Sequence, residues 1–314
     1  MTRLPDDGPT ARPELIVLSP WPCDLLELQG PDRFRLLQGL VTADVKDLAP
    51  GSAASGFFTT GQGRILADFR IFERVEGSWL MLPEGTGEAI LTHLTKYKVA
   101  SQVEMRRLEG RVHFEVRGGE DAETQASALV PGVGSDAVRL VDASGADERQ
   151  WISLAAEEVE AELGEWQRSS GVELRRLSPG EADLARIERG ELRFGVDFSA
   201  ENFPQETGRE SAISYTKGCY LGQEVVARIH YRGGVQRQPR GLRFTGALPL
   251  AGAELLLDGR AVGRATSVAA SPQFGAIGLA LVHQRGAAPG TRLEVAGAPD
   301  GSVAEVVALP FGAS

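Results

Sequence analysis

A cysteine bracketed by glycines is the feature of this sequence with the clearest capacity for chemistry. Cys219 lies in the run KGCYLGQE (residues 217–224), and good helix-forming residues follow Gly222. The bracketing glycines suit a sharp loop, since glycine adopts backbone angles that other residues avoid. A helix beginning after Gly222 would place Cys219 near its N-terminus, where the helix dipole and positive charge favour a thiolate. The pattern predicts a reactive thiol, although a small buried cysteine in a glycine turn would look the same.

Positive charge gathers around this cysteine although the chain as a whole carries a formal net charge of −10. Glu224 is the one acid between residues 217 and 243, against six basic residues: Lys217, Arg228, Arg232, Arg237, Arg240 and Arg243. Arginine binds carboxylates and phosphates through paired hydrogen bonds, so the cluster predicts an anion site. A solvated basic strand and loop would show the same charges. Because Lys217 lies so close to Cys219, we expect it to assist the thiol.

The same segment resembles a known family. KGCYLGQEVVAR (residues 217–228) resembles the signature of the YgfZ family of folate-binding proteins, relatives of the glycine-cleavage T protein (aminomethyltransferase). PQE (204–206) is similar to that family, and GPDRFRLLQGLVTADV (30–45) is similar to the start of the T-protein superfamily. The likeness covers most of residues 15–314. It implies an α+β, GcvT-like fold: a three-domain ring of two α+β subdomains and a C-terminal β-barrel around a tetrahydrofolate channel.

The resemblance also implies folate contacts. RIERG (186–190) and GVD (195–197) resemble the R-x-E-x-G…G-x-D run of the T protein, whose glutamate hydrogen-bonds the pterin ring, so Glu188 is the expected ligand. A carboxylate can accept two parallel N–H bonds from such a ring. Without the resemblance, Glu188 would be interpreted as a surface helix carboxylate. Trp21 is expected to stack near the pterin and Tyr220 to contact the cofactor, although a second tryptophan expected near residue 182 is absent.

Asp68 and the arginines of segment 228–243 each have two possible roles. Asp68 aligns with the second acid of a T-protein pair that faces folate, while Ala67 replaces the first. A carboxylate there could orient or deprotonate an amine, or it could be a structural hydrogen-bonding group. Arg228 and Arg237 are expected to hold a folate polyglutamate tail. The basic segment 228–243 could instead contact RNA phosphates, the weaker of these two alternatives.

Apolar periodicity predicts the elements that must position these groups. Strands are expected at 15–18, 25–28, 55–60, 65–72, 79–82, 103–105, 112–116 and 151–154, and helices from 30–32 onward and over 88–99, 157–167 and 178–190. Strands and helices in this irregular order predict α+β rather than a doubly wound sheet. The Ala/Gly/Asp-rich segment 118–149 shows little pattern and is expected to form loops.

The pattern of apolar residues along the sequence changes after residue 238. Short apolar runs at 255–257, 261–268, 276–282, 293–295 and 303–309 alternate with turn signals, which predicts a small closed or sandwich β domain. We therefore divide the chain into a loose N-terminal arm (1–14), a folate-binding body (15–237) and a C-terminal β-barrel (238–314).

Composition excludes several classes of protein. The 314 residues are 42% hydrophobic and 24% charged, which argues against disorder. The two cysteines are far apart and the four histidines are scattered, so neither a disulfide framework nor a dedicated zinc site is expected. No apolar run has the length of a membrane span or of a signal sequence, and a cytoplasmic location without membrane attachment is expected.

These observations lead to one preferred function and one alternative. The preferred function is a tetrahydrofolate-binding accessory protein that supports iron–sulfur protein assembly or repair, including iron–sulfur-dependent tRNA modification. Its partners would be folate and iron–sulfur client proteins, and Cys219 would be its functional thiol. The alternative is a folate-dependent aminomethyltransferase or a related one-carbon transferase, for which Asp68 would be the important acid.

Overall fold

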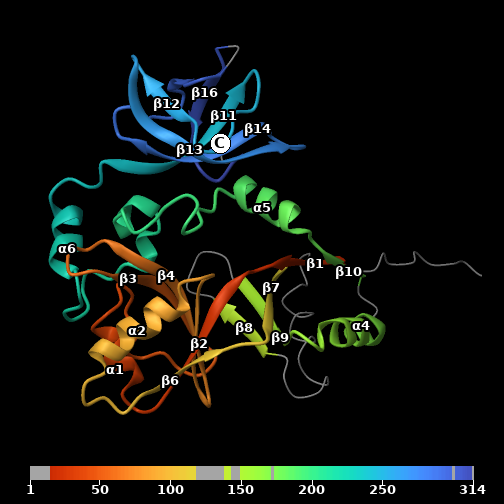
Figure 1. The fold of residues 1–314 in the computed structure, drawn as a ribbon, viewed down its shortest axis with the longest axis vertical. Helices are drawn as coiled ribbons and strands as arrows, with labels where there is room; N and C mark the ends of the chain where they lie inside the picture. The colour runs from red at the N-terminus through yellow and green to blue at the C-terminus, as the bar shows by residue number, and fades with distance from the viewer. Residues whose placement is uncertain (1–14, 118–137, 143–148, 171–172, 299–300, 313–314) are drawn as a thin grey trace, which may run out of the picture. The chain divides into compact units, whose positions relative to one another are not determined.

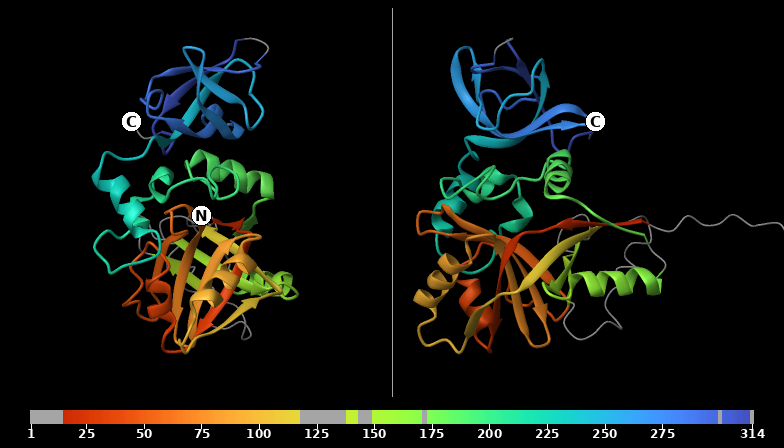
Figure 2. Two further views of the ribbon diagram at one scale, coloured as in Figure 1. Left: turned by 60° about the vertical axis from the view of Figure 1, so that its left-hand side comes forward. Right: turned by 45° about the vertical axis from the view of Figure 1, so that its right-hand side comes forward.

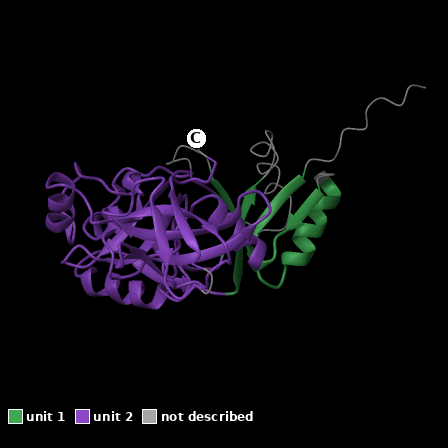
Figure 3. Cartoon of the chain, turned by 90° about the horizontal axis from the view of Figure 1, so that it is seen from above, with its two compact units in different colours: residues 1–21, 110–140, 149–179 green, residues 22–109, 141–148, 180–314 purple. Residues whose placement is uncertain are grey.

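The computed structural model describes residues 15–117, 138–142, 149–170, 173–298 and 301–312. The predicted arm, 1–14, lies outside these residues. Contacts divide the chain into two compact units, coloured separately in Figure 3. The smaller unit comprises residues 1–21, 110–140 and 149–179, and the larger comprises 22–109, 141–148 and 180–314. All candidate site residues except Trp21 belong to the larger unit.

The larger unit contains a five-stranded antiparallel sheet in the order β3-β4-β5-β2-β6. Its strands are β2 (Cys23–Gln29), β3 (Ala53–Thr59), β4 (Ile65–Arg74), β5 (Gly77–Pro83) and β6 (Glu104–Leu108). Helices α1 (Arg33–Gln38) and α2 (Gly87–Tyr97) contribute Leu36, Leu37, Ile90 and Leu94 to the core of this sheet. Burial of these alternating and helically spaced apolar side chains holds the elements together.

A second five-stranded sheet has the order β10-β1-β7-β9-β8. Its strands are β1 (Leu15–Pro20), β7 (Arg111–Arg117), β8 (Val138–Asp142), β9 (Arg149–Ala155) and β10 (Glu173–Arg176). β1 pairs in parallel with β10 and antiparallel with β7. Helix α4 (Val159–Ser170) buries Val159, Leu163 and Trp166 in the core cluster of this sheet.

The C-terminal strands close into a six-stranded barrel in the order β11-β14-β13-β12-β15-β16 (Figures 1 and 2). They are β11 (Arg237–Thr245), β12 (Glu254–Leu257), β13 (Arg260–Ser271), β14 (Gly275–His283), β15 (Arg292–Val295) and β16 (Val303–Val307). Inward-facing side chains such as Leu242, Leu255 and Val306 fill its interior. Closure removes the unpaired edges that an open sheet of this size would expose.

Between the first sheet and the barrel the chain forms α5 (Pro179–Glu188), the short 3₁₀ helices η1 (Pro204–Thr207) and η2 (Glu210–Ala212), and α6 (Gln223–Tyr231). One buried cluster joins Phe57 of β3, Val226 of α6 and Leu281 of β14. Another joins Ile187 of α5 to Ile277 and Leu279 of β14. These clusters hold the candidate site residues of the larger unit on a packed framework.

The α+β prediction is confirmed, and the predicted strands, helices and barrel correspond to observed elements. Three strands were not predicted: β8, in the segment expected to be loops, and β10 and β11. In β11 (RQPRGLRFT) charged residues and a proline mask the buried positions Leu242 and Phe244. The rest of segment 118–149 outside β8 and Arg149 lies beyond the described residues.

The division into arm, body and barrel stays a prediction, since the boundaries of the two compact units fall at other residues. Among the described residues, no helix combines the length and apolar character that crossing a membrane requires.

Candidate functional site

The loop before α6 displays Cys219 at the protein surface. Cys219 is a free, exposed thiol, and α6 begins at Gln223 after Gly222, whose φ of 86° lies in the left-handed region that favours glycine. The helix predicted to begin after Gly222 is confirmed, so the sulfur lies close to a helix N-terminus. The chemical role of Cys219 stays a prediction.

The turn between β3 and β4 supports this loop. The hydroxyl of Thr59 donates to the carbonyl oxygen of Leu221 at 2.5 Å. A Cβ atom on Gly222 would lie 2.4 Å from the carbonyl oxygen of Thr60 and 3.0 Å from Cα of Gly63. The β3–β4 turn therefore packs directly against the cysteine loop.

Lys217 is buried and points toward the C-terminal end of α1. Its ammonium donates to the carbonyl oxygens of Gln38 at 2.9 Å and Ala43 at 2.6 Å. Burial lowers the pKa of Lys217 to about 8, and the nearby charge of Asp44 partly opposes this shift. These contacts make Lys217 an anchor of the loop, since the carbonyls at a helix C-terminus lack partners within the helix. Its predicted role in assisting the thiol stays a prediction.

Tyr220, on the other side of Cys219, is also buried. Its hydroxyl has no hydrogen-bond partner among the described residues, and burial raises its pKa to about 12. The Lys217 ammonium lies 5.0 Å from the ring centroid of Tyr220. The exposed sulfur is thus held between two buried neighbours.

Asp68 lies on β4 and forms an ion pair that the sequence did not suggest. Arg209 donates to Oδ2 of Asp68 at 2.8 Å, and its guanidinium lies 4.7 Å from the ring of Phe57 and 5.4 Å from that of Phe198. Oδ1 of Asp68 is buried without a hydrogen-bond partner among the described residues. Ala67 is fully buried in the core beside it, so a second carboxylate at that position would enter apolar packing.

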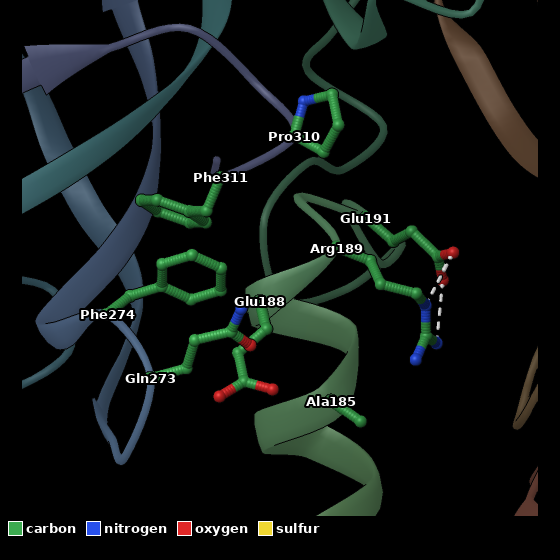
Figure 4. A pocket seen from close by; sticks show the side chains of 8 residues that line it. All are labelled: Ala185, Glu188, Arg189, Glu191, Gln273, Phe274, Pro310 and Phe311. Carbon is green, nitrogen blue, oxygen red and sulfur yellow. Dashed lines mark hydrogen bonds and ion pairs between the residues drawn. The ribbon is translucent and has the colours of Figure 1, made fainter. Parts of the chain in front are cut away.

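Glu188 lines a cavity between the end of α5 and the barrel. The cavity has a volume of about 440 Å³ and is lined by Ala185, Glu188, Arg189, Glu191, Gln273, Phe274, Pro310 and Phe311. The hydroxyl of Ser271 donates to Oε1 of Glu188 at 2.6 Å. Figure 4 shows the rings of Phe274 and Phe311 side by side on the barrel side. Their centroids lie 5.8 Å apart. Sequence reasoning missed these barrel residues, because no local motif marks them.

The arginine and aspartate of the RIERG and GVD runs are structural. Buried Arg186 donates to Asp197 at 2.7 Å and to Ser267 of β13 at 2.8 Å. Asp197 also accepts hydrogen bonds from the hydroxyls of Thr266 and Ser267. This network ties α5 to the barrel and so fixes the position of Glu188.

The predicted basic cluster divides between two elements. Arg228 pairs with Glu224 on the exposed face of α6 at 2.6 Å. Arg237 is exposed at the start of β11. Arg240 donates to the carbonyl oxygen of Ala287 at 2.6 Å and is half-buried, so it is used within the protein. The contacts of Arg228 and Arg237 with a folate tail stay predictions.

Trp21 belongs to the smaller unit. Its ring meets that of Trp151 edge-on with centroids 5.8 Å apart, and the guanidinium of Arg149 lies 5.6 Å from the ring of Trp21. The predicted stacking of Trp21 on a pterin stays a prediction.

Comparison with known proteins defines the class of fold. The glycine cleavage system aminomethyltransferase T from Bartonella henselae superposes with a TM-score of 0.80 at 20% identity, covering 94% of this chain and 86% of that one. Residues 237–312 match the glycine cleavage T-protein C-terminal barrel domain. The molecule therefore has the glycine-cleavage T-protein fold, and the GcvT-like prediction is confirmed.

Relatives in sequence define the family within that fold. The tRNA-modifying protein YgfZ of Pectobacterium carotovorum subsp. carotovorum is 31% identical over 234 residues, which cover 72% of this chain and 68% of the relative. The proteins of the same name from Yersinia enterocolitica and Serratia proteamaculans are each 31% identical over 233 residues, covering 71% of this chain and 68% of the relative. This chain belongs to the YgfZ family, as its motifs predicted.

Proposed function

We propose that this protein binds tetrahydrofolate and supports iron–sulfur enzymes of tRNA modification, with Cys219 as its functional thiol. The observation that carries the proposal is the exposed sulfur of Cys219 on a loop whose neighbours Lys217 and Tyr220 are buried. The relatives are named as tRNA-modifying proteins, which supports the tRNA part of the proposal. Such work is expected to take place in the cytoplasm.

The loop suits chemistry that needs a sulfur in a fixed position. Lys217 anchors the loop to α1, and Thr59 anchors it to the β3–β4 turn. An accessible thiolate can attack a disulfide or a related electrophilic sulfur, and thiolates are the usual ligands of iron–sulfur clusters. Either reaction fits a partner enzyme that contains such a cluster.

The cavity at Glu188 supports the folate part of the proposal. Its volume of about 440 Å³ falls within the usual range for small-molecule sites. Ser271 engages one oxygen of Glu188, and a carboxylate has further lone pairs for the N–H groups of a pterin. Phe274 and Phe311 supply apolar surface to the same cavity. The chain would thus bind and orient the ring, and bound tetrahydrofolate would supply one-carbon chemistry.

Tetrahydrofolate binding tests this part directly. Titration followed by intrinsic tryptophan fluorescence should show Glu188→Gln binding about tenfold or more weakly, because a hydrogen bond to a charged group contributes about 1.5–3 kcal/mol. Glu191→Gln is the matched control, since Glu191 lines the cavity but pairs with Arg189. Unchanged affinity in Glu188→Gln would show that this cavity is not the pterin site.

Complementation tests the thiol. In a strain that lacks its own family member, the native protein and Cys23→Ala should restore the activity of an iron–sulfur tRNA-modifying enzyme. Cys219→Ser should fail, because a hydroxyl can neither exchange with disulfides nor replace a thiolate. Full rescue by Cys219→Ser would remove the thiol from the mechanism.

The second candidate is aminomethyl transfer, and Asp68 is the observation in its favour. Oδ1 of Asp68 has no hydrogen-bond partner among the described residues, so it could receive an amine. Its other oxygen is already held by Arg209. Turnover of aminomethyl groups with a lipoylated carrier protein, abolished in Asp68→Asn, would establish this activity. No turnover with the native protein would rule it out.

A further inference from the structure

Aromatic rings lie exposed at the C-terminal end of α6, away from the contacts that anchor the cysteine loop. Tyr231 is 72% exposed, one of the most exposed large apolar side chains of the described residues. The ring of His230 stacks on that of Tyr215, with centroids 3.8 Å apart and planes 22° apart. Tyr231 meets His230 and Tyr215 edge-on at 5.0 and 6.4 Å. We call Tyr215, His230 and Tyr231 the aromatic cluster.

The segment that carries the aromatic cluster is basic in an acidic protein. From residue 209 to residue 237 there are five Lys and Arg and two Glu, a net of +3, against −10 for the chain. Both acids are engaged: Glu210 accepts a hydrogen bond from Tyr215, and Glu224 pairs with Arg228. Arg232, which directly follows Tyr231 at the end of α6, is exposed. Arg209 is paired with Asp68 and Lys217 is buried, so Arg232 and Arg237 supply the exposed positive charge of this segment.

We propose that this surface binds single-stranded RNA, with unpaired bases stacking on the aromatic cluster and phosphates contacting Arg232 and Arg237. Bases stack on tyrosine and histidine in most single-strand RNA sites, whereas A-form duplexes do not expose base faces. Charge complementarity favours a polyanion over a protein partner. The choice of RNA also rests on the proposed role in tRNA modification.

The position of the surface connects it with the thiol. Cys219 lies before the first turn of α6, and the aromatic cluster lies at the last turn of the same helix. A helix of nine residues is about 13 Å long. RNA bound at one end would thus lie about one short helix away from the sulfur, close enough for a partner enzyme to contact both.

A similar pair elsewhere in the larger unit supplies a matched control. On α2, Tyr97 lies 5.1 Å from His93, and the ammonium of Lys96 is 5.4 Å from its ring. Tyr97 is 38% exposed, and no arginine belongs to α2. Tyr97→Ala and Lys96→Ala therefore remove the same kinds of group without touching the proposed surface.

Fluorescence anisotropy with a labelled oligouridine of about ten nucleotides, a length typical of single-strand sites, measures the interaction. We expect the native protein to bind it more tightly than an RNA duplex of equal length. Tyr231→Ala should weaken binding about tenfold, because stacking one base contributes roughly 1–3 kcal/mol. Arg232→Ala should weaken it and reduce the salt slope by about one between roughly 50 and 200 mM salt. Tyr97→Ala and Lys96→Ala should bind like the native protein.

Three results would overturn the proposal. The first is no binding of the native protein even at low salt. The second is equal loss in Tyr231→Ala and Tyr97→Ala, or equal affinity for single strand and duplex, which would indicate general adhesion. The third is native RNA affinity in Tyr231→Ala together with failed complementation, which would make this a protein-docking surface. Each leaves the folate titration and the Cys219 test untouched, so failure here is distinct from failure of the proposed function.

Discussion

At the scale of single residues, the two thiols of this protein differ in their surroundings. Cys219 is exposed, whereas the thiol of Cys23 on β2 is desolvated. Burial, with a smaller contribution from the charge of Asp24, raises the pKa of Cys23 far above that of a free cysteine. Since the thiolate is the reactive form, Cys23 should be the less reactive of the two thiols.

Alkylation rates should reflect this difference. In the native protein at neutral pH, iodoacetamide should modify Cys219 more than about tenfold faster than Cys23, because each pKa unit changes the thiolate fraction tenfold. Mass spectrometry of the two cysteine peptides over time measures both rates, and in urea the rates should converge. Equal rates in the native state would contradict the burial assigned to Cys23.

Lys217 gives the stability a pH dependence. Its pKa is lowered to about 8 in the folded protein from 10.5. Between these two values the unfolded chain binds more protons at this residue than the folded protein does. The free energy of unfolding therefore rises with pH in this window, and the cost of the buried ammonium is fully present below it.

Urea unfolding tests this sign at pH 7.5, just below the window that begins at the lowered pKa of about 8, and at pH 9.5, inside it. The native protein should gain stability relative to Lys217→Met at the higher pH, by up to about 1.4 kcal/mol per pH unit. At the lower pH the variant loses the hydrogen bonds to Gln38 and Ala43, which costs about 1–3 kcal/mol. A difference between the two proteins that does not change with pH would show that Lys217 keeps its ordinary pKa.

At the scale of elements, the cysteine loop, the β3–β4 turn and η1 form one packed assembly. The loop backbone is tied to Gly39 after α1 by a hydrogen bond from the Leu221 amide. Gln205 of η1, from the PQE run, donates to the carbonyl oxygen of Val226 in α6 at 2.7 Å. Residues that resembled family motifs in sequence thus serve in part to hold the loop in place.

The two glycines of the loop should differ sharply in their tolerance of a side chain. Gly222→Ala would adopt a positive φ and place a Cβ atom 2.4 Å from the Thr60 carbonyl oxygen, so we expect a loss of about 2–4 kcal/mol. Gly218→Ala meets no atom within 4 Å and should change stability by less than about 0.5 kcal/mol. Urea unfolding measures both. Similar losses in the two variants would contradict the packing of Gly222 against the turn.

At the scale of the larger unit, a buried ion pair between Arg186 of α5 and Asp197 is hydrogen-bonded to the barrel. The side chains of Arg186 and Asp197 are 9% and 0% exposed, and the network continues to Thr266 and Ser267 of β13. Glu188 directly follows Ile187, which packs against β14 of the barrel. The position of Glu188 therefore depends on this connection.

Asp197→Asn should destabilise the protein by up to about 3–5 kcal/mol, because it removes the fully buried carboxylate and leaves the Arg186 charge to the more exposed Asp183. Glu254→Gln is the control: it breaks the exposed pair with Arg264 between β12 and β13 and should cost at most about 1 kcal/mol. Far-UV circular dichroism in urea reports both. A small effect of Asp197→Asn would show that solvent reaches this pair.

The sequence alone determined most of the elements, the fold class and the family, because apolar periodicity is local and the motifs are contiguous runs. Helix α6, the hairpin of β3 and β4 and most barrel strands were predictable on that ground. β11 was not, since its buried face is interrupted by arginines, a proline and a glycine.

Tertiary structure alone decided which groups meet. Arg209 and Asp68 are separated by 141 residues, and Ser271 and Glu188 by 83, yet each pair is joined by a hydrogen bond. The ammonium of Lys217 likewise donates to carbonyl oxygens more than 170 residues away, which the spacing along the chain does not reveal. Local patterns report which face of an element is buried, but the partner on the other side is chosen by the packing of the whole chain.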